Sequence, residues 1–276
     1  MEKQLPELSI FFPFWNEEKN IRHVVESAIP IAKKVAKEWE MLLIDDGSSD
    51  KTYEIAKQLA KENRNVKAIT HNPNRGYGAA LKEGLESAQY KYIVFTDGDR
   101  QFNFNEITKF IDEIGSVDIV IGFRKKRRDS LARHILMYLL KIWDYIFFRF
   151  YFRDIDCGFK MFKKSALQQI MPLRSEGAMI TTEILAKATR KKLKIKEVEV
   201  NHYSRQFGAQ SGANIAVVIR AVLESFILWY DIHNRNEKSS SSVRLFVWSG
   251  HAKNSIASSA DLNIITAPCQ RLKNFS

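Results

Sequence analysis

Residues 1–122 alternate between short apolar runs and longer segments with helical periodicity. This alternation is typical of a parallel β-sheet wrapped by helices, because a crossover helix usually joins two parallel strands. Pro30 should break or kink the first helix, since proline lacks an amide donor and clashes with the preceding turn. The expected strands are Leu8–Phe12, Glu40–Ile44, Val66–Thr70, Tyr92–Thr96 and Asp118–Gly122, and the expected helices are Glu17–Lys37, Lys51–Glu62, Gly78–Ser87 and Asn105–Ile114.

Polar residues follow the first four expected strands. They are Asn16-Glu17, Asp45 to Asp50, His71-Asn72 and Asp97-Gly98-Asp99. In open α/β sheets, ligands bind beyond the carboxyl ends of the strands. These four segments are therefore the first candidates for a binding site.

Asp97-Gly98-Asp99 places two carboxylates two residues apart. On an extended chain both point to the same side, where they can share one divalent cation that in turn binds a diphosphate. The alternative is a tight acidic turn in which Gly98 supplies an unusual φ. The tripeptide alone leaves both interpretations open.

Two further loops allow either a functional or an ordinary interpretation. In Asp45 to Asp50, Gly47 makes a turn and Ser49 or Asp50 caps the next helix, but capping does not require two aspartates before the glycine. Acidic groups at a strand end also accept hydrogen bonds from a base or ribose. In Asn74 to Ala80, the glycines permit close approach of the backbone to a ligand, or they form a simple turn.

The second half of the chain holds a basic and aromatic segment. Gly122 to Arg153 contains nine basic and two acidic residues. Within it, the expected helix Ser130–Phe152 (130–152) has one charged and one apolar face, which suits an anionic membrane surface, although a core helix would show a similar pattern. A second two-faced helix is expected at Asn214–Asp231 (214–231). Other expected elements are the strands Phe159–Phe162 and Lys194–Val200 and the helix Ile180–Arg190.

The formal net charge of +11 favours phosphate-bearing partners such as nucleotides, nucleic acid or an anionic membrane. Two cysteines, Cys157 and Cys269, are too few for a disulfide framework and favour a reducing compartment. We see no secretory signal and no apolar run of membrane-spanning length, so we expect the start of the chain to stay in the cytosol. Residues 1–235 should form the catalytic domain, and the Ser-rich segment 236–276 should be a flexible tail.

Taken in order, these motifs resemble those of a known family. They are Pro13-Phe14-Trp15-Asn16-Glu17-Glu18, Asp45 to Thr52, Asn74-Arg75-Gly76-Tyr77-Gly78, Asp97 to Gln101, Gly122-Phe123-Arg124, Asp156-Cys157-Gly158-Phe159-Lys160 and Arg205 to Ser211. The chain is similar to glycosyltransferase family 2 with a GT-A fold over about residues 6–232. Within that family it most resembles the dolichyl-phosphate mannose or glucose synthases.

The resemblance implies roles for individual residues. Pro13, Asn16, Glu17 and Asp46 would line the nucleoside pocket, with Asp45 behind them. Asp97, Gly98, Asp99 and Gln101 would meet the donor diphosphate, with Asp97, Asp99 and Gln101 holding Mg²⁺ or Mn²⁺. Asp99, Arg124 and Arg205 would be catalytic, and Arg124, Arg133, Arg205 and Ser211 would hold the acceptor phosphate.

Two departures from the family pattern stand out. Gly98 occupies a position where the family usually has alanine, a change that the metal should tolerate. Ser211-Gly212 replaces a frequent Ser-Lys, which puts the exact acceptor in doubt.

The resemblance implies inverting transfer of a hexose from a nucleotide-sugar, of the GDP-mannose or UDP-glucose type, to a polyprenyl or dolichyl phosphate. The enzyme would be peripheral, at the cytoplasmic face of a membrane. A phosphate acceptor is already ionised at neutral pH and needs no general base. Glu183 is a possible acid or base, but a structural or solvated carboxylate is the better interpretation of a helical glutamate.

Three alternatives stay open. A family 2 enzyme could act on a soluble or polysaccharide acceptor. A metal-dependent phosphatase also uses Asp-x-Asp after a strand, but there Thr or Val is expected where this chain has Gln101. A basic nucleic-acid-binding protein would explain the charge, but the chain contains no recognised reader motif, and we expect no nucleic-acid partner.

Overall fold

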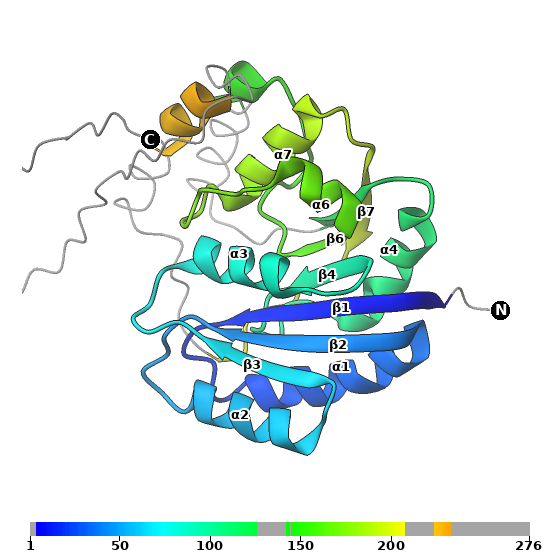
Figure 1. Cartoon of the computed structure of the whole chain (residues 1–276), viewed down its shortest axis with the longest axis vertical. Coiled ribbons are helices and arrows are strands. Elements are labelled where there is room, and N and C mark those ends of the chain that lie inside the picture. Colours follow the sequence, from blue (N-terminus) through cyan, green and yellow to red (C-terminus); the bar gives the residue numbers. More distant parts are fainter. Residues whose placement is uncertain (1–3, 126–141, 144, 208–223, 233–276) are drawn as a thin grey trace, which may run out of the picture. The chain divides into compact units, whose positions relative to one another are not determined.

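The structure is a computed structural model that describes residues 4–125, 142–143, 145–207 and 224–232 (Figure 1). Arg133, Ser211 and the segment 236–276 lie outside the described residues, and so the predictions made for them stay predictions. The same holds for residues 130–141 and 214–223 of the two expected amphipathic helices. Among the helices that are described, none is long and apolar enough to span a lipid bilayer.

The described strands form one mostly parallel sheet with the order β3-β2-β1-β4-β6-β5-β7. β6 runs antiparallel to both of its neighbours, and the other pairs are parallel. This strand order and direction confirm the expected α/β fold with a mostly parallel sheet. The strands are β1 (Leu5–Phe14), β2 (Ala36–Asp45), β3 (Val66–Thr70), β4 (Tyr92–Thr96), β5 (Ile119–Arg124), β6 (Phe159–Lys163) and β7 (Ile195–Val200).

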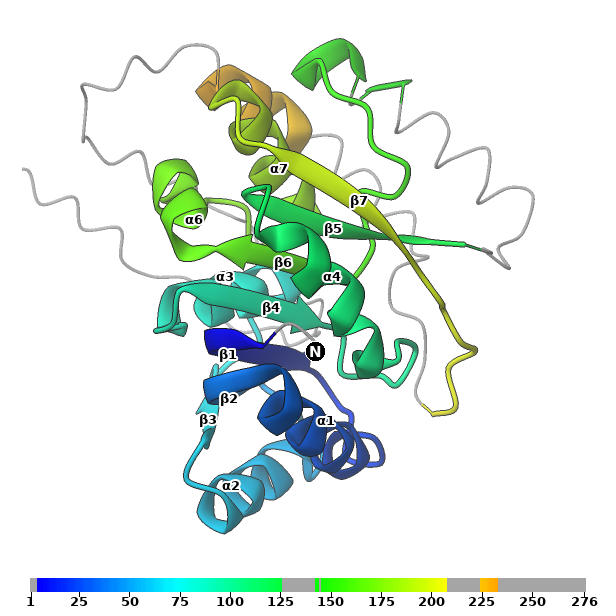
Figure 2. The same cartoon turned by 90° about the vertical axis from the view of Figure 1, so that its right-hand side faces the viewer.

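Helices cover both faces of this sheet (Figures 1 and 2). One face packs against α1 (Ile21–Val35), α2 (Thr52–Glu62), the 3-10 helix η1 (Phe104–Glu106) and α4 (Ile107–Ile114). The other packs against α3 (Tyr77–Ser87), α6 (Lys164–Ile170) and α7 (Ile180–Arg190). Side chains alternate along a strand, so Ile10 and Phe12 of β1 enter the first core while Phe11 enters the second. Burial on both faces explains why the central strands β1, β2 and β4 contain long apolar runs.

Most expected elements are present, with some corrections. Pro30 does not break the first helix, because α1 continues through it to Val35 and packs Val25, Ala28 and Ala32 against the sheet. This helix begins at Ile21 and not at Glu17. The residues before it form a turn in which the Glu17 carbonyl accepts the amides of Asn20 and Ile21. The expected helix at Asn105–Ile114 is divided into η1 and α4, and α6 was not expected from the sequence.

The expected helix at 130–152 is helical at 142–143 and 145–148 among its described residues. It ends before Phe152, because Arg149 has a φ of +58° and therefore leaves the right-handed helical conformation. In the second expected helix, the described residues 224–232 are helical.

Candidate active site

The carboxyl ends of β1, β2 and β4 meet at one edge of the sheet. Phe14 pairs with Asp45 at the ends of β1 and β2, and β4 runs parallel to β1 on its other side. The polar segments that follow these strands are therefore brought together, as the sequence predicts. They approach a fourth segment, 201–207, which follows β7.

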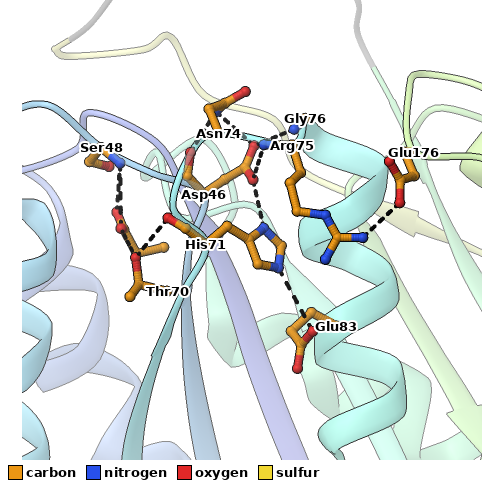
Figure 3. Close-up of polar contacts among 10 residues, drawn as sticks. Asp46, Ser48, Thr70, His71, Asn74, Arg75, Gly76, Glu83 and Glu176 are labelled. Atoms are coloured by element: carbon orange, nitrogen blue, oxygen red, sulfur yellow. Dashed lines mark hydrogen bonds and ion pairs between the residues drawn. The ribbon is translucent and has the colours of Figure 1, made fainter. Parts of the chain in front are cut away.

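Asp46 anchors the glycine-containing loop after β3 (Figure 3). Its Oδ2 accepts the Asn74 side-chain amide at 2.8 Å and the Gly76 amide at 2.8 Å. Its Oδ1 accepts the Arg75 amide at 3.1 Å and lies 2.7 Å from His71 Nδ1. Asp46 is buried, and both of its oxygens are engaged in shaping this loop. The nucleoside contact predicted for Asp46 stays a prediction.

His71 was noted only as a polar residue after a strand, and its role was missed. Its ring is buried between two carboxylates, with Nε2 3.8 Å from Glu83 Oε2 of α3 on the side away from Asp46 (Figure 3). His71 thereby connects the end of β3 to α3. The position directly after a strand was the only sequence signal for it.

Asn16, Glu17 and Asp45 position the loop between β2 and α2. Asp45 accepts the Thr70 hydroxyl at 2.7 Å, which joins the ends of β2 and β3. Asn16 has a φ of +55° and accepts the Ser49 amide at 2.8 Å. Pro13 lies in β1 beside these residues and is buried. The predicted nucleoside-pocket residues thus lie at one end of β1 and β2.

The glycines at 76 and 78 accommodate the chain's own backbone. A Cβ atom on Gly78 would lie 2.5 Å from backbone atoms of Glu176 and Gly177, and one on Gly76 would lie 2.9 Å from the Glu176 carbonyl oxygen. The Ala79 amide donates to that carbonyl at 3.2 Å. The close approach inferred from these glycines is therefore made by residues 176–177 of the chain itself.

Asp97 and Asp99 lie directly after β4. Asp97 Oδ1 accepts the Tyr77 hydroxyl at 2.9 Å, and a Cβ atom on Gly158 would lie 2.0 Å from Asp97 Oδ2. Burial and the neighbouring charge of Asp99 raise the pKa of Asp97 to about 7. The contact between Tyr77 and Asp97 was not predicted from the sequence, although Tyr77 lies in the glycine-containing motif Asn74 to Gly78.

Gly98 does not have the positive φ that the acidic-turn interpretation requires. That part of the interpretation is wrong. The glycine is instead explained by Phe14, since a Cβ atom on residue 98 would lie 2.2 Å from the Phe14 ring.

Asp99 is held from two sides. Its Oδ1 accepts the Gln101 amide at 3.0 Å, and its Oδ2 accepts Arg205 Nη2 at 2.6 Å. The Gln101 side chain donates to the Tyr203 carbonyl at 3.0 Å, and so it holds the segment that carries Arg205. The role of Gln101 as a metal ligand stays a prediction, as does the phosphate contact of Arg205.

Arg124 forms a two-pronged ion pair with Asp154, which the sequence analysis missed. Arg124 Nε lies 2.6 Å from Asp154 Oδ2, and Nη2 lies 2.8 Å from Oδ1. The Asp154 side chain is buried and that of Arg124 is 13% exposed. If Arg124 binds a phosphate, as the sequence predicts, it must do so while Nε and Nη2 are held by Asp154.

Glu183 lies at the start of α7 and is completely buried. Its carboxylate accepts the amides of Arg174 and Ser175, at 3.0 and 2.7 Å, and pairs with Lys187 at 2.6 Å. These contacts support the structural interpretation of this residue over an acid or base role.

The donor set at Asp97 and Asp99 suits a hard divalent cation. Within the described ranges, no cluster of three or more His, Cys, Asp or Glu side chains could hold a metal ion. The carboxylates of Asp97 and Asp99 and the amide oxygen of Gln101 would supply only part of a coordination shell. Substrate phosphates and water would supply the rest. Mg²⁺ is commonly bound in this way.

Comparison with known proteins identifies similar sequences. The family model described as glycosyl transferase family 2 matches residues 9–171. Dolichyl-phosphate beta-glucosyltransferase of Saccharomyces cerevisiae is 29% identical over 241 residues, covering 78% of this chain and 71% of the relative. Dodecaprenyl-phosphate galacturonate synthase of Rhizobium johnstonii is 28% identical, covering 79% of this chain and 65% of the relative. The chain thus spans about two thirds of the length of these relatives.

Solved structures share the fold. Glucosyl-3-phosphoglycerate synthase from Mycobacterium tuberculosis, in complex with Mn²⁺, uridine-diphosphate and glucosyl-3-phosphoglycerate, has a TM-score of 0.60 and 18% identity, covering 80% of each chain. The same enzyme with Mn²⁺, uridine-diphosphate-glucose and phosphoglyceric acid has a TM-score of 0.61 and 16% identity, covering 82% of this chain and 79% of that one. At these identities the similarity concerns the fold alone.

Proposed function

The chain belongs to glycosyl transferase family 2, and from this we propose that it transfers a sugar from a nucleotide-sugar donor to a polyprenyl phosphate at a membrane surface. One observation carries the proposal. The paired carboxylates of Asp97 and Asp99 lie at the carboxyl edge of the sheet, within reach of Arg205, a cation suited to phosphate.

The names of three relatives agree on a polyprenyl phosphate as the acceptor, but they differ in the sugar that is transferred. Their sugars are glucose, galacturonate and 4-deoxy-4-formamido-L-arabinose, whereas each name contains a polyprenyl phosphate. We propose a hexose donor of the UDP-glucose or GDP-mannose type. Glucose is the first sugar to test, because three of the relatives are named beta-glucosyltransferases.

We propose Mg²⁺ or Mn²⁺ as the cofactor, held by Asp97 and Asp99 with help from Gln101. When bound, the cation would supply positive charge to the leaving diphosphate. Asp97 is oriented for this task by Tyr77, and Asp99 by the Gln101 amide. Both carboxylates are thus held in place before a donor arrives.

The acceptor phosphate needs no general base at neutral pH, because its second pKa is about 6. We propose that Arg205 and Arg124 hold it, with Arg133 and Ser211 as further ligands. Asp154 keeps the Arg124 guanidinium in one orientation. Attack opposite the leaving group predicts inversion at the anomeric carbon.

We propose that two aromatic helical segments, one at 142–143 and 145–148 and the other at 224–232, meet the membrane from its cytoplasmic side. They pack together, since Trp143 Nε1 donates to Ser225 at 2.8 Å and the Trp143 ring contacts Phe147 and Phe226. Their outer side chains remain exposed to solvent. These are Ile142, Tyr145, Ile146, Phe226, Ile227 and Tyr230, which we call the aromatic surface.

Transfer can be tested with labelled UDP- and GDP-sugars and one polyprenyl phosphate, by following label extracted into organic solvent. We expect lipid-linked product, its loss with EDTA, and its loss in Asp99→Ala with the circular dichroism spectrum unchanged. Product only with a soluble or polysaccharide acceptor would contradict the lipid acceptor. Release of inorganic phosphate without sugar transfer would instead indicate that the protein is a metal-dependent phosphatase.

Membrane association can be tested by flotation with anionic and neutral vesicles. Trp143 is a poor site for substitution, because it lies in the contact between the two segments. We expect Ile146→Ser combined with Ile227→Ser to weaken flotation, whereas Arg22→Ser on α1 should not. Unchanged flotation of the double variant would contradict the role of the aromatic surface, and a salt-dependent shift of DNA would contradict the absence of a nucleic-acid partner.

A further inference from the structure

The Arg205 guanidinium lies between two carboxylates of the candidate donor site. Nη2 is 2.6 Å from Asp99 Oδ2, and Nη1 is 3.6 Å from Glu17 Oε1. Asp99 is 5% and Glu17 8% exposed. Carboxylates withdrawn from water require compensating positive charge or hydrogen bonds. Arg205 provides that charge to both.

The position of Arg205 is fixed by the segment that carries it. The Tyr203 amide donates to the Gln101 carbonyl at 2.8 Å, and the Gln101 side chain donates back to the Tyr203 carbonyl at 3.0 Å. Upstream, Glu106 accepts both the backbone and the side-chain amide of Asn201, at 2.8 and 2.6 Å. The segment is therefore attached at two points to the chain that follows Asp99.

The oxygen that binds Arg205 belongs to a carboxylate proposed to receive the divalent cation. A guanidinium and a divalent cation are both positive, and a close approach of the two is unfavourable. We propose that Arg205 is the resident counter-ion of Asp99 and Glu17 in the donor-free protein, and that a divalent cation displaces it to reach Asp99. This inference rests on the proposed function for the identity of the cation.

The exchange would give Arg205 two successive partners. Before the donor binds, its guanidinium is committed to Asp99, and so it is a poor ligand for an acceptor phosphate. Once the cation and donor neutralise Asp99, the same guanidinium becomes available to the phosphate. The exchange would therefore require the cation and donor to bind before the acceptor phosphate.

The inference can be tested without turnover, by titrating donor-free protein with Mn²⁺ and measuring free Mn²⁺ by electron paramagnetic resonance. We expect Arg205→Gln to bind Mn²⁺ about tenfold more tightly than the natural chain, as the loss of one charge-assisted hydrogen bond implies. Arg75→Gln is the matched control, because it removes the same charge from a side chain that pairs with Glu176. We expect its affinity to change less than about twofold.

A second measurement needs no variant. Phenylglyoxal modifies accessible arginines, and its rate at each site can be followed by mass spectrometry. We expect Mn²⁺ alone to increase the rate at Arg205 by about tenfold while the rate at exposed Arg22 stays constant. This readout remains valid if Arg205→Gln does not fold.

The outcomes separate the exchange from the proposed reaction. Equal Mn²⁺ affinity in the natural chain and Arg205→Gln, or no change in labelling when Mn²⁺ is bound, overturns the exchange and leaves the transferase proposal intact. Absence of Mn²⁺ binding in both proteins overturns the exchange together with metal dependence. Lack of lipid-linked product alongside the expected Mn²⁺ results overturns the transfer reaction and leaves the exchange supported.

Discussion

The ring of Phe14 fills the space that a side chain at position 98 would need. An ideal Cβ atom on Gly98 would lie 2.2 Å from Phe14 Cε1 and 2.5 Å from Cδ1. Phe14 is buried at the end of β1 and its ring is near that of Phe12. The glycine between the two aspartates is therefore a packing requirement imposed by the neighbouring strand.

Gly98→Ala should destabilise the protein by about 1–3 kcal/mol, because an added methyl in a packed region forces its neighbours to move. Combining it with Phe14→Leu should recover part of that loss, which a double-mutant cycle in urea unfolding would measure as a favourable coupling energy. Gly115→Ala is the control, since residue 115 has a φ of −61° that suits alanine. Additive free energies of unfolding would show that Phe14 and position 98 are not coupled.

Asp154→Asn should lower both stability and activity. The substitution removes the charge that Arg124 faces in a largely buried site, and breaking such a pair costs about 3 kcal/mol. Asp156→Asn is the matched control because Asp156 is exposed in the same loop, and we expect it to unfold at nearly the natural urea concentration. If Asp154→Asn retains the stability and the acceptor KM of the natural chain, Asp154 does not position Arg124.

Sequence periodicity predicted the buried framework well. β3 and β4 have the bounds that their sequences indicated. For β4 the reason is burial, since four of its five residues are buried and it forms a short apolar run. Element ends were less accurate. α1 is preceded by a turn at 18–20, and the helix that ends at Phe148 does so because of the backbone conformation of Arg149. Neither feature has a periodic signal.

The position of the candidate site at the strand ends was also predictable, but its side-chain pairings were not. Asp99 and Arg205 are separated by 106 positions, and Arg124 and Asp154 by 30. Residue spacing within a motif carries no information on such partners. Lys160 illustrates the same limit, since it is fully buried and donates to the Cys157 carbonyl, although lysines are rarely buried.

Glu183→Gln should reduce stability more than catalysis. The carboxylate binds the amides of Arg174 and Ser175 and the Lys187 ammonium, so a neutral amide would lose an ion pair in a buried site. We expect a loss of about 2–4 kcal/mol in urea unfolding and a kcat within about threefold of the natural value at a temperature where the variant is folded. A large loss of kcat with unchanged stability would restore Glu183 as a catalytic acid or base.

The last prediction concerns the stability cost of Asp97. Burial and the charge of Asp99 raise the pKa of Asp97 from 3.8 to about 7 in the folded protein. The folded state therefore holds a proton more tightly than the unfolded chain does. The resulting stability is fully present below pH 3.8 and is lost as the pH rises towards 7.

Asp97→Asn imitates the protonated carboxyl at every pH. We therefore expect it to be more stable than the natural chain at pH 8, by about 2–4 kcal/mol, and the difference to shrink steadily as the pH falls towards 4. Asp112→Asn, on α4, is a control for removal of a carboxylate away from the site. Urea unfolding at several pH values measures the effect. A difference between Asp97→Asn and the natural chain that does not vary with pH would contradict the raised pKa, whereas the expected result would show that the charged Asp97 carboxylate lowers the stability of the folded protein.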